Sequence, residues 1–141
     1  MSLRQRTPIS SIMTTNLVLL NTTDGLDKAE HLFKKHKIRH IPVVDGGKIK
    51  GMLSLTDLLR ISFVDGAYED EDSVETVVYD MFTIPQVMAK HVQSVTPDAT
   101  IKEVAEILSK KEYHALPVVQ NEKLVGIVTT TDLIKYLLDQ F

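Results

Sequence analysis

Cysteine is absent from this chain of 141 residues. Its absence excludes a disulfide framework, thiol catalysis and a thiolate zinc site, and it fits a reducing compartment. Apolar runs are also short, far below the roughly 20 residues that a membrane span requires. The N-terminus is polar and basic, with no apolar stretch of the kind found in a signal peptide. We therefore expect a cytoplasmic protein with no membrane partner.

Lysine and arginine are absent between Ser62 and Phe82, where seven acidic residues occur. The whole chain carries a formal charge of -3, and no expected helix shows a basic stripe, so nucleic acid is not an expected partner. We interpret residues 63–82 as an acidic, solvated connector, with a helix beginning near Ser73. That helix could also cover part of a cleft or a dimer surface. A cation resting on Glu69–Asp72 has no ordered ligand spacing to support it.

An internal repeat covers most of the chain. Residues 9–61 align with residues 84–136 at a constant offset of 75, without a gap. The identities cluster in two blocks, Pro-Val-Val and Gly-x-x-[Ser/Thr]-x-Thr-Asp-Leu. Two copies are too few for a solenoid, which needs at least three, so we expect them to pack face to face about a pseudo-twofold axis. The predicted ranges are residues 7–62 for the first repeat and 83–141 for the second.

Each copy predicts the order strand, helix, strand, strand, helix, with a short helix in front. The helix predictions rest on apolar residues at helical spacing, and Asp45-Gly46-Gly47 predicts a tight turn. Thr100 with Glu103 predicts a capping box, and Gly25 occupies the equivalent position in the first copy. The expected short helices are 8–13 and 84–88, the expected strands are 17–20, 41–44, 49–53, 92–95, 116–119 and 124–128, and Pro42 and Pro117 are expected at strand beginnings, where a missing N–H is tolerated.

Two hydroxyl-rich segments end in an acid, Ser54-Leu55-Thr56-Asp57 and Thr129-Thr130-Thr131-Asp132. The simplest interpretation is a helix N-cap, in which the hydroxyl and the acid satisfy free backbone N–H groups. The same geometry suits an anion such as phosphate, and a carboxylate one turn into the helix can accept hydrogen bonds from a ribose diol. Occurring twice in a duplicated frame, the motif indicates a nucleotide site more strongly than either copy alone.

Signatures of catalysis are absent. The five histidines show no metal-binding spacing, and there is no P-loop, nucleophile elbow or Ser-His-Asp arrangement. Met13 and Met88 could be named as copper ligands, but two isolated methionines at core spacing indicate packing. We therefore expect no enzyme activity, no metal and no cofactor.

The repeated blocks resemble those of a tandem pair of cystathionine-beta-synthase-type (CBS) domains, also called a Bateman module. The segments that carry the resemblance are His40–Val44 with Gly51–Leu58, and Ala115–Val119 with Gly126–Leu133. The resemblance implies a mixed α/β (α+β) fold of two β-α-β-β-α repeats, whose sheets pack together with flanking helices. It also implies clefts that bind AMP, ADP, ATP or S-adenosylmethionine.

The resemblance also assigns roles to individual residues. It places the ribose-binding acids at Asp57 and Asp132 and the hydroxyls near phosphate or ribose at Ser54 and Thr129, with Thr56 and Thr131 as neighbours. Basic residues before the proline-containing strand reach phosphates in such proteins, which suggests Arg39, His40 and His114 here; a solvated strand edge and a core histidine are the competing interpretations. The candidate adenine pocket comprises Ile12, Met13, Ile41 and Pro42 in one copy and Val87, Met88, Leu116 and Pro117 in the other, unless these residues are ordinary core.

Two functions remain open from the sequence. The first is a stand-alone regulatory sensor of an adenine nucleotide that acts as a homodimer, with unequal affinities at its two clefts. The stripe Leu133-Ile134-Leu137-Leu138 is a candidate dimer surface or simply core. The second is a module without a small-molecule ligand, which regulates a partner enzyme or transporter.

Overall fold

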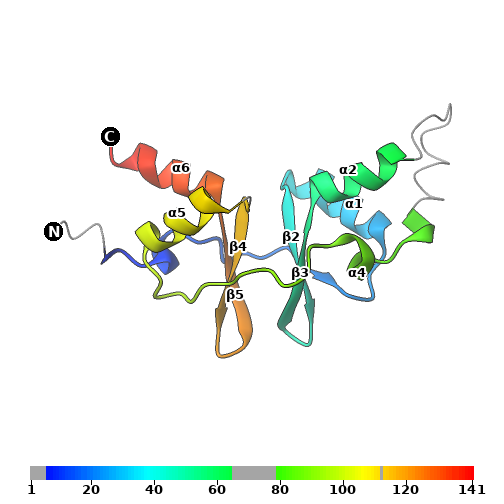
Figure 1. The fold of residues 1–141 in the computed structure, drawn as a ribbon, viewed down its shortest axis with the longest axis horizontal. Coiled ribbons are helices and arrows are strands. Elements are labelled where there is room, and N and C mark those ends of the chain that lie inside the picture. The colour runs from blue at the N-terminus through cyan, green and yellow to red at the C-terminus, as the bar shows by residue number, and fades with distance from the viewer. Residues whose placement is uncertain (1–5, 65–78, 112) are drawn as a thin grey trace. The chain divides into compact units, whose positions relative to one another are not determined.

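The computed structural model describes residues 6–64, 79–111 and 113–141, without the side chains of 62–64 (Figure 1). Residues 65–78 lie outside these residues, and with them most of the predicted acidic segment 63–82 and the start of the helix expected near Ser73. The chain forms two compact units. The Asp57 unit is Val18–His91, and the Asp132 unit joins the residues up to Leu17 to Val92–Phe141.

The Asp57 unit contains a three-stranded sheet of order β1-β2-β3. β1 pairs with β2 in parallel, and β2 pairs with β3 antiparallel. The predicted strand–helix–strand–strand–helix order is confirmed, although the first strand is shorter and later than expected. The elements are β1 (Leu20–Asn21), α1 (Leu26–His36), β2 (His40–Asp45), β3 (Lys48–Ser54), α2 (Leu55–Val64) and α4 (Ile84–Val87).

The Asp132 unit repeats this plan around a two-stranded sheet, β4-β5. The predicted strand 92–95 is reduced to one parallel bridge between Val95 and Val118, at the position of β1 in the other unit. Thr100 accepts a hydrogen bond from the Glu103 amide (3.0 Å), which is the N-cap half of the predicted capping box. The elements are η2 (Ile9–Ser11, a 3-10 turn where a helix was expected), α5 (Ile101–Lys110), β4 (Ala115–Gln120), β5 (Lys123–Thr129) and α6 (Thr130–Asp139).

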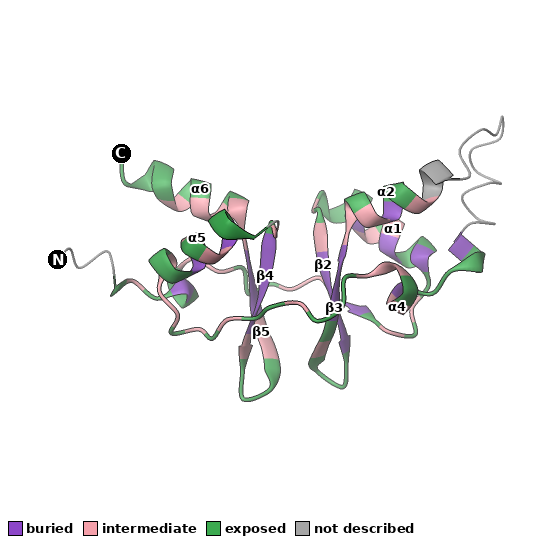
Figure 2. Ribbon diagram, viewed as in Figure 1, coloured by how far each residue is buried: buried purple, intermediate pink, exposed green. Residues whose placement is uncertain are grey.

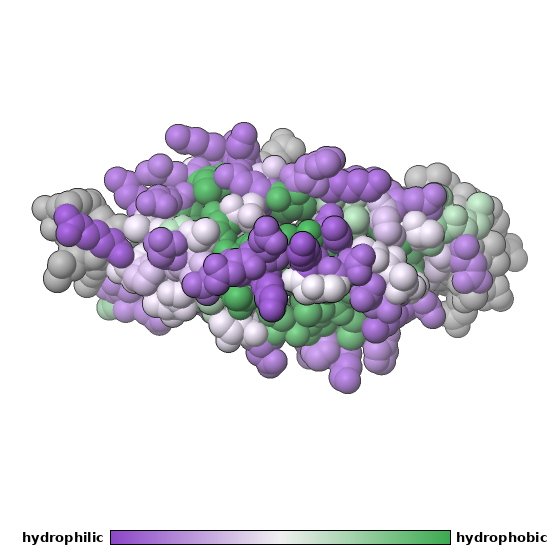
Figure 3. Space-filling model, turned by 90° about the horizontal axis from the view of Figure 1, so that it is seen from below, coloured by the Kyte–Doolittle hydropathy of each residue, from purple (hydrophilic) through white to green (hydrophobic). Residues whose placement is uncertain are grey.

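The two hairpins share one register and one bulge position. Asp45 lies opposite Lys48, and Gln120 lies opposite Lys123, so each turn has two residues. All four turn residues have positive φ, at 61° and 83° for Gly46 and Gly47 and at 53° and 67° for Asn121 and Glu122. Positive φ at both central positions suits the twist of a β-hairpin. Figure 3 shows both hydrophilic side chains and hydrophobic ones on the surface in view.

The prolines do not begin their strands, contrary to the prediction. Pro42 and Pro117 are each the third residue of their strand. Pro117 lies opposite Ile127, whose N–H and C=O both bond to Thr14. This pair therefore needs no hydrogen bond between the two strands, and the missing N–H of proline costs no ladder bond on the β5 side.

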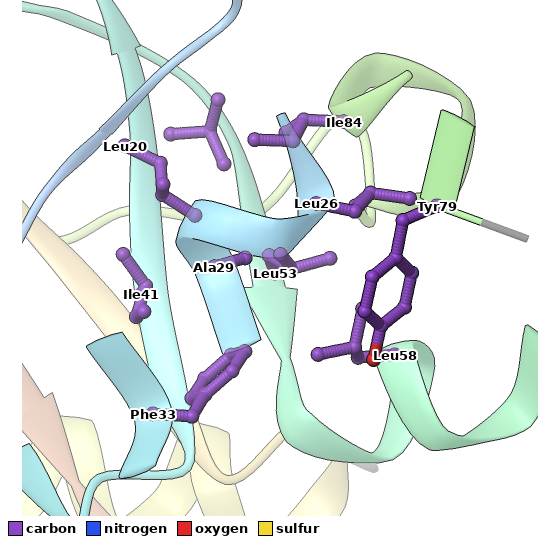
Figure 4. Close-up of a cluster of buried hydrophobic side chains, with 10 residues drawn as sticks. Leu20, Leu26, Ala29, Phe33, Ile41, Leu53, Leu58, Tyr79 and Ile84 are labelled. Atoms are coloured by element: carbon purple, nitrogen blue, oxygen red, sulfur yellow. The ribbon is translucent and has the colours of Figure 1, made fainter. Parts of the chain in front are cut away.

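Each unit has its own apolar core, formed mainly by buried strand residues and one helix face (Figure 2). In the Asp57 unit, Leu26, Ala29 and Phe33 of α1 pack on Ile41 and Leu53 (Figure 4). Tyr79 and Leu58 also belong to this core, with the Tyr79 ring beside Leu58. In the Asp132 unit the core cluster of buried residues is Ile9, Val104, Leu108, Leu116, Val118 and Val128.

The compact units do not coincide with the two contiguous sequence repeats. The short element at the front of the first repeat, Ile9–Ser11, packs in the Asp132 unit, and Ile9 is fully buried there. The equivalent element of the second repeat, Ile84–Val87, packs in the Asp57 unit, where Ile84 is fully buried. The repeats have thus exchanged their leading segments, which are residues 9–14 and 84–89 together with the contacts of Thr14 and Ala89 to the strands.

Helices of the described chain are too short or too polar to cross a membrane.

Candidate functional site

The Ser54–Asp57 motif lies where β3 passes into α2. The Asp57 amide donates to Ser54 Oγ (3.0 Å), and the Ser54 amide donates to Asp57 Oδ2 (3.2 Å). This reciprocal pair satisfies amides that a helix N-terminus otherwise leaves free. The Asp57 side chain is about one-fifth exposed (21%), and its Oδ1 lies 3.8 Å from Arg60 Nη1.

The Thr129–Asp132 motif repeats this geometry where β5 passes into α6. The Asp132 amide donates to Thr129 Oγ1 (3.2 Å), and the Thr129 amide donates to Asp132 Oδ2 (2.9 Å). The capping interpretation is therefore confirmed in both units. Because each cap uses Oδ2 alone, each carboxylate retains a second acceptor oxygen, and capping leaves room for a ligand hydroxyl. Thr56 and Thr131 are exposed in the first turns of these helices.

The backbone of a residue with a basic side chain lies beside each helix start. The Leu55 amide donates to the Arg39 carbonyl (2.8 Å), and the Thr130 amide donates to the His114 carbonyl (3.0 Å). Arg39 and His114 are both exposed and occupy equivalent positions. His40 follows at the start of β2, opposite Ser54. A guanidinium offers five N–H donors in a planar fork, whereas an imidazole has only two ring nitrogens, so the two helix starts differ in what they can offer an anion.

The candidate adenine residues fall into different groups from those expected. Ile12 and Met13 pack on the core that contains Leu116. Val87 and Met88 pack on the core that contains Ile41. Ile12 and Met13 therefore lie in a different core cluster from Ile41, because the leading segments are exchanged between the units. Their place around an adenine stays a prediction. Pro42 and Pro117 are both buried in their strands.

Each leading segment packs closely against a glycine. A Cβ added to Gly126 would lie 2.7 Å from Met13 Sδ, and a Cβ added to Gly51 would lie 2.5 Å from Met88 Sδ. Next to these contacts, Thr14 exchanges two hydrogen bonds with Ile127 (2.8 and 3.0 Å). The repeat shows in the sequence that a Met and a Gly recur together, which could have predicted these contacts. Because both pairs have the same offset of 75 residues, the sequence does not show which Met contacts which Gly.

Met52 and Ala89 form the corresponding pair of hydrogen bonds in the Asp57 unit (3.0 and 2.9 Å). Each strand that ends in a capping motif is therefore edged by a leading segment from the other repeat. Each of these strands thus carries, in order, the glycine that contacts the methionine, the residue that bonds to the leading segment, and the residue that caps the next helix.

Perturbed carboxylates lie away from the motifs, on or just before α1. Burial alone would raise the pKa of Glu30, but hydrogen bonds from Lys34 and Tyr79, with the nearby Lys34 charge, hold that pKa below its usual value. A backbone hydrogen bond from Asn21, together with Lys28, lowers the pKa of Asp24 despite some desolvation. No cluster of three or more His, Asp or Glu side chains suited to a metal occurs within 6–64, 79–111 and 113–141.

Comparison with protein families gives a match over most of the chain. The family model described as CBS domain matches residues 9–63 and again residues 84–139. An uncharacterized protein of Methanocaldococcus jannaschii, MJ1404, is 30% identical over 136 residues, which are 94% of this chain and 32% of that protein. The chain thus spans about a third of that relative's length.

Solved structures with the same fold include a protein from Vibrio cholerae named for acetoin utilization (AcuB). It is 30% identical, with a TM-score of 0.78, and the match covers 94% of this chain and 91% of that one. CBSX2, solved in complex with AMP, has a TM-score of 0.78 at 21% identity and covers 95% and 98% of the two chains. The domain pair of MJ0100, solved with 5-methylthioadenosine and S-adenosyl-L-methionine, has a TM-score of 0.79 at 23% identity and covers 96% and 98%.

Proposed function

Because the chain belongs to the CBS-domain family and carries two copies of that domain, we propose that it is a regulatory module that senses an adenosine-type nucleotide. The candidate ligands are AMP, ADP, ATP and S-adenosylmethionine, bound through the motifs that end in Asp57 and Asp132. We assign it no catalytic role and a cytoplasmic location, which fits the absence of cysteine.

The observation that carries this proposal is the repeated cap with its spare carboxylate oxygen. In each motif Oδ2 accepts from the backbone, and Oδ1 is the acceptor offered to a ribose hydroxyl. The first-turn amides and the hydroxyls of Thr56 and Thr131 suit the phosphate side of the ligand. Ile41 and Leu116, with their flanking apolar residues, are the proposed surroundings of the adenine.

The two sites are proposed to bind with unequal affinity. Arg39 stands beside the start of α2, where its planar guanidinium can contact two phosphate oxygens at once. His114 holds the equivalent place beside α6 and lacks the planar five-donor fork of arginine. Phosphorylated ligands should therefore favour the Ser54–Asp57 motif.

Regulation requires a ligand that binds two arrangements of the module with different affinity. The proposed output is a shift in that equilibrium, read by a partner enzyme or transporter. A ligand that bound both arrangements equally would change nothing, however tightly it bound.

A second candidate function is a module without a small-molecule ligand, which acts through its surfaces. The exposed apolar residues of α6 favour it, because Ile134 and Leu137 are each 57% exposed and Leu138 is 65% exposed. Most of the second half of α6 is accordingly coloured as exposed (Figure 2). A homodimer that buries this stripe is compatible with both functions, and we propose it for either one.

The deciding experiment is a thermal-shift and calorimetric titration of ligand-free protein with AMP, ADP, ATP, S-adenosylmethionine, NAD and GTP. A ligand at 100 times its Kd adds about 2.7 kcal/mol, which shifts the Tm by several degrees. We expect Asp57→Ala and Asp132→Ala each to abolish binding at one site, and the double variant to abolish both.

Thr100→Ala is the matched control, since it removes a helix N-cap far in sequence from both motifs at a cost of about 1 kcal/mol. It should lower the Tm without changing ligand affinity. If no adenosine compound shifts the unaltered protein, the partner-binding function replaces the nucleotide sensor. If a compound binds the double variant normally, the proposed sites are wrong.

A further inference from the structure

The exchanged leading segments have a role that the repeat pattern does not show. We propose that Met13 and Thr14 are positioning residues for the Thr129–Asp132 motif, and that Met88 and Ala89 position the Ser54–Asp57 motif. Each candidate site is thus held by a segment that belongs, in sequence, to the other repeat. The ligand readout of this inference rests on the proposed function, while its structural readout does not.

The contacts in the Asp132 unit form a short, continuous path. Met13 Sδ lies 2.7 Å from the position that a Cβ of Gly126 would take, and Thr14 bonds to both backbone groups of Ile127. Two residues later, Thr129 makes the cap with Asp132. If Met13 and Thr14 move, they therefore pull on β5 two residues before the Thr129–Asp132 cap, so the movement should change the geometry of that cap.

The same path runs through the Asp57 unit, with one difference. Met88 Sδ and the Ala89 carbonyl both crowd the Cβ position of Gly51, at 2.5 and 2.6 Å. At Gly126 the two nearest atoms belong to the Met13 side chain, and the Thr14 carbonyl is farther away at 3.2 Å. Crowding at Gly126 is therefore relieved by shortening a side chain, whereas crowding at Gly51 is not.

Short covalent connections then link each segment to the other unit. Thr14 pairs with β5, and six residues later Leu20 pairs with β2. Ala89 pairs with β3, and six residues later Val95 pairs with Val118 of β4. Each connection runs from the strand that carries one motif to a strand beside the other, so it offers a route by which occupancy at one motif reaches the other unit.

The test uses amide signals of the intact chain, recorded by NMR without ligand. Met13→Ala should shift the Asp132 amide signal and raise hydrogen exchange at Thr14 and Ile127 by about tenfold or more. It should leave Asp57, Met52 and Ala89 unchanged. Met88→Ala is the matched control and should do the reverse.

A second pair of variants distinguishes a specific positioning effect from a general loss of packing. Gly126→Ala should disturb the Asp132 amide, and the double variant Gly126→Ala/Met13→Ala should restore it towards the original signal. Gly51→Ala should not be rescued by Met88→Ala, because the Ala89 carbonyl remains in the way. A general loss of stability would not show this pattern of rescue.

Ligand titration completes the test and separates the two proposals. Met13→Ala should weaken binding at the Asp132 site by about tenfold, which corresponds to about 1.4 kcal/mol, and leave the Asp57 site unchanged. The inference is overturned if Met13→Ala disturbs Asp57 instead, or both motifs equally. If the amide signals behave as expected but no adenosine compound binds the unaltered protein, the proposed function fails and the positioning role stands.

Discussion

The Asp57 unit and the Asp132 unit are built from equivalent residues, yet they cover their last helices differently. Leu58 of α2 is 1% exposed, whereas its equivalent, Leu133 of α6, is only partly buried. Tyr79 makes part of this difference, because its ring packs beside Leu58 (Figure 4). The position 75 residues before Tyr79 is Arg4, so the aromatic cover is not a repeated feature. Equal repeats therefore need not give equally buried helices.

The largest effect is expected when the two equivalent leucines, Leu58 and Leu133, are each truncated to alanine. Leu58→Ala should cost about 2–5 kcal/mol, because the side chain is fully enclosed and a cavity remains. Leu133→Ala should cost clearly less, since solvent already reaches that side chain. Urea denaturation of both variants measures the difference. Equal costs would contradict the idea that Tyr79 encloses one helix and not the other.

A smaller effect is expected at the two hairpin turns. Glu122 holds a positive φ of 67°, where Gly47 stands in the other unit. Left-handed backbone costs a side-chain-bearing residue about 1 kcal/mol or more, so Glu122→Gly should stabilise the chain by about 0.5–1 kcal/mol after the added entropy of the unfolded glycine. Gly47→Glu is the reverse variant and should destabilise by a similar amount. Chemical denaturation gives both values, and a loss of stability in Glu122→Gly would show that side-chain contacts outweigh the turn geometry.

The smallest expected effect concerns acid stability, and only the Asp57 unit carries the carboxylate involved. Because the pKa of Glu30 is lowered by folding, its contribution is present above the unfolded value near 4.5 and is lost as the pH falls through the folded value. Glu30→Gln should therefore lower stability at pH 7 by less than about 1 kcal/mol and make little difference at pH 3. Thermal melts from pH 3 to pH 7 measure this dependence. Glu106→Gln, an exposed change on α5, should not alter it, and an unchanged profile in Glu30→Gln would exclude the Lys34 and Tyr79 hydrogen bonds as its cause.

Local features were predicted well because their causes are local. The hairpin around Gly46 and Gly47, the Thr100 cap and both hydroxyl-to-acid motifs depend on residues three or four positions apart. Apolar periodicity likewise predicted the helices that are observed as α1 and α5. The positions of Pro42 and Pro117 were misjudged, because proline is tolerated wherever its nitrogen faces away from the partner strand, and local sequence does not show that direction.

The candidate site was only partly accessible from the sequence. The residues of both motifs were identified, and their capping geometry is now observed, but their ligand roles remain predictions. The partners of Met13 and Met88 could not be chosen, since Gly51 and Gly126 lie in identical local surroundings. A methionine at one offset matches either glycine equally well in sequence.

What the sequence determined by itself is the repeat, the order of its elements and the two capped helix starts, all of which follow from short-range hydrogen bonding and apolar periodicity. Only the tertiary structure decided that Met13 packs on Gly126 and Met88 on Gly51, and that Tyr79 encloses Leu58. The physical reason is that duplicated segments carry the same local signals, so packing between residues far apart in the chain has to choose among equivalent partners.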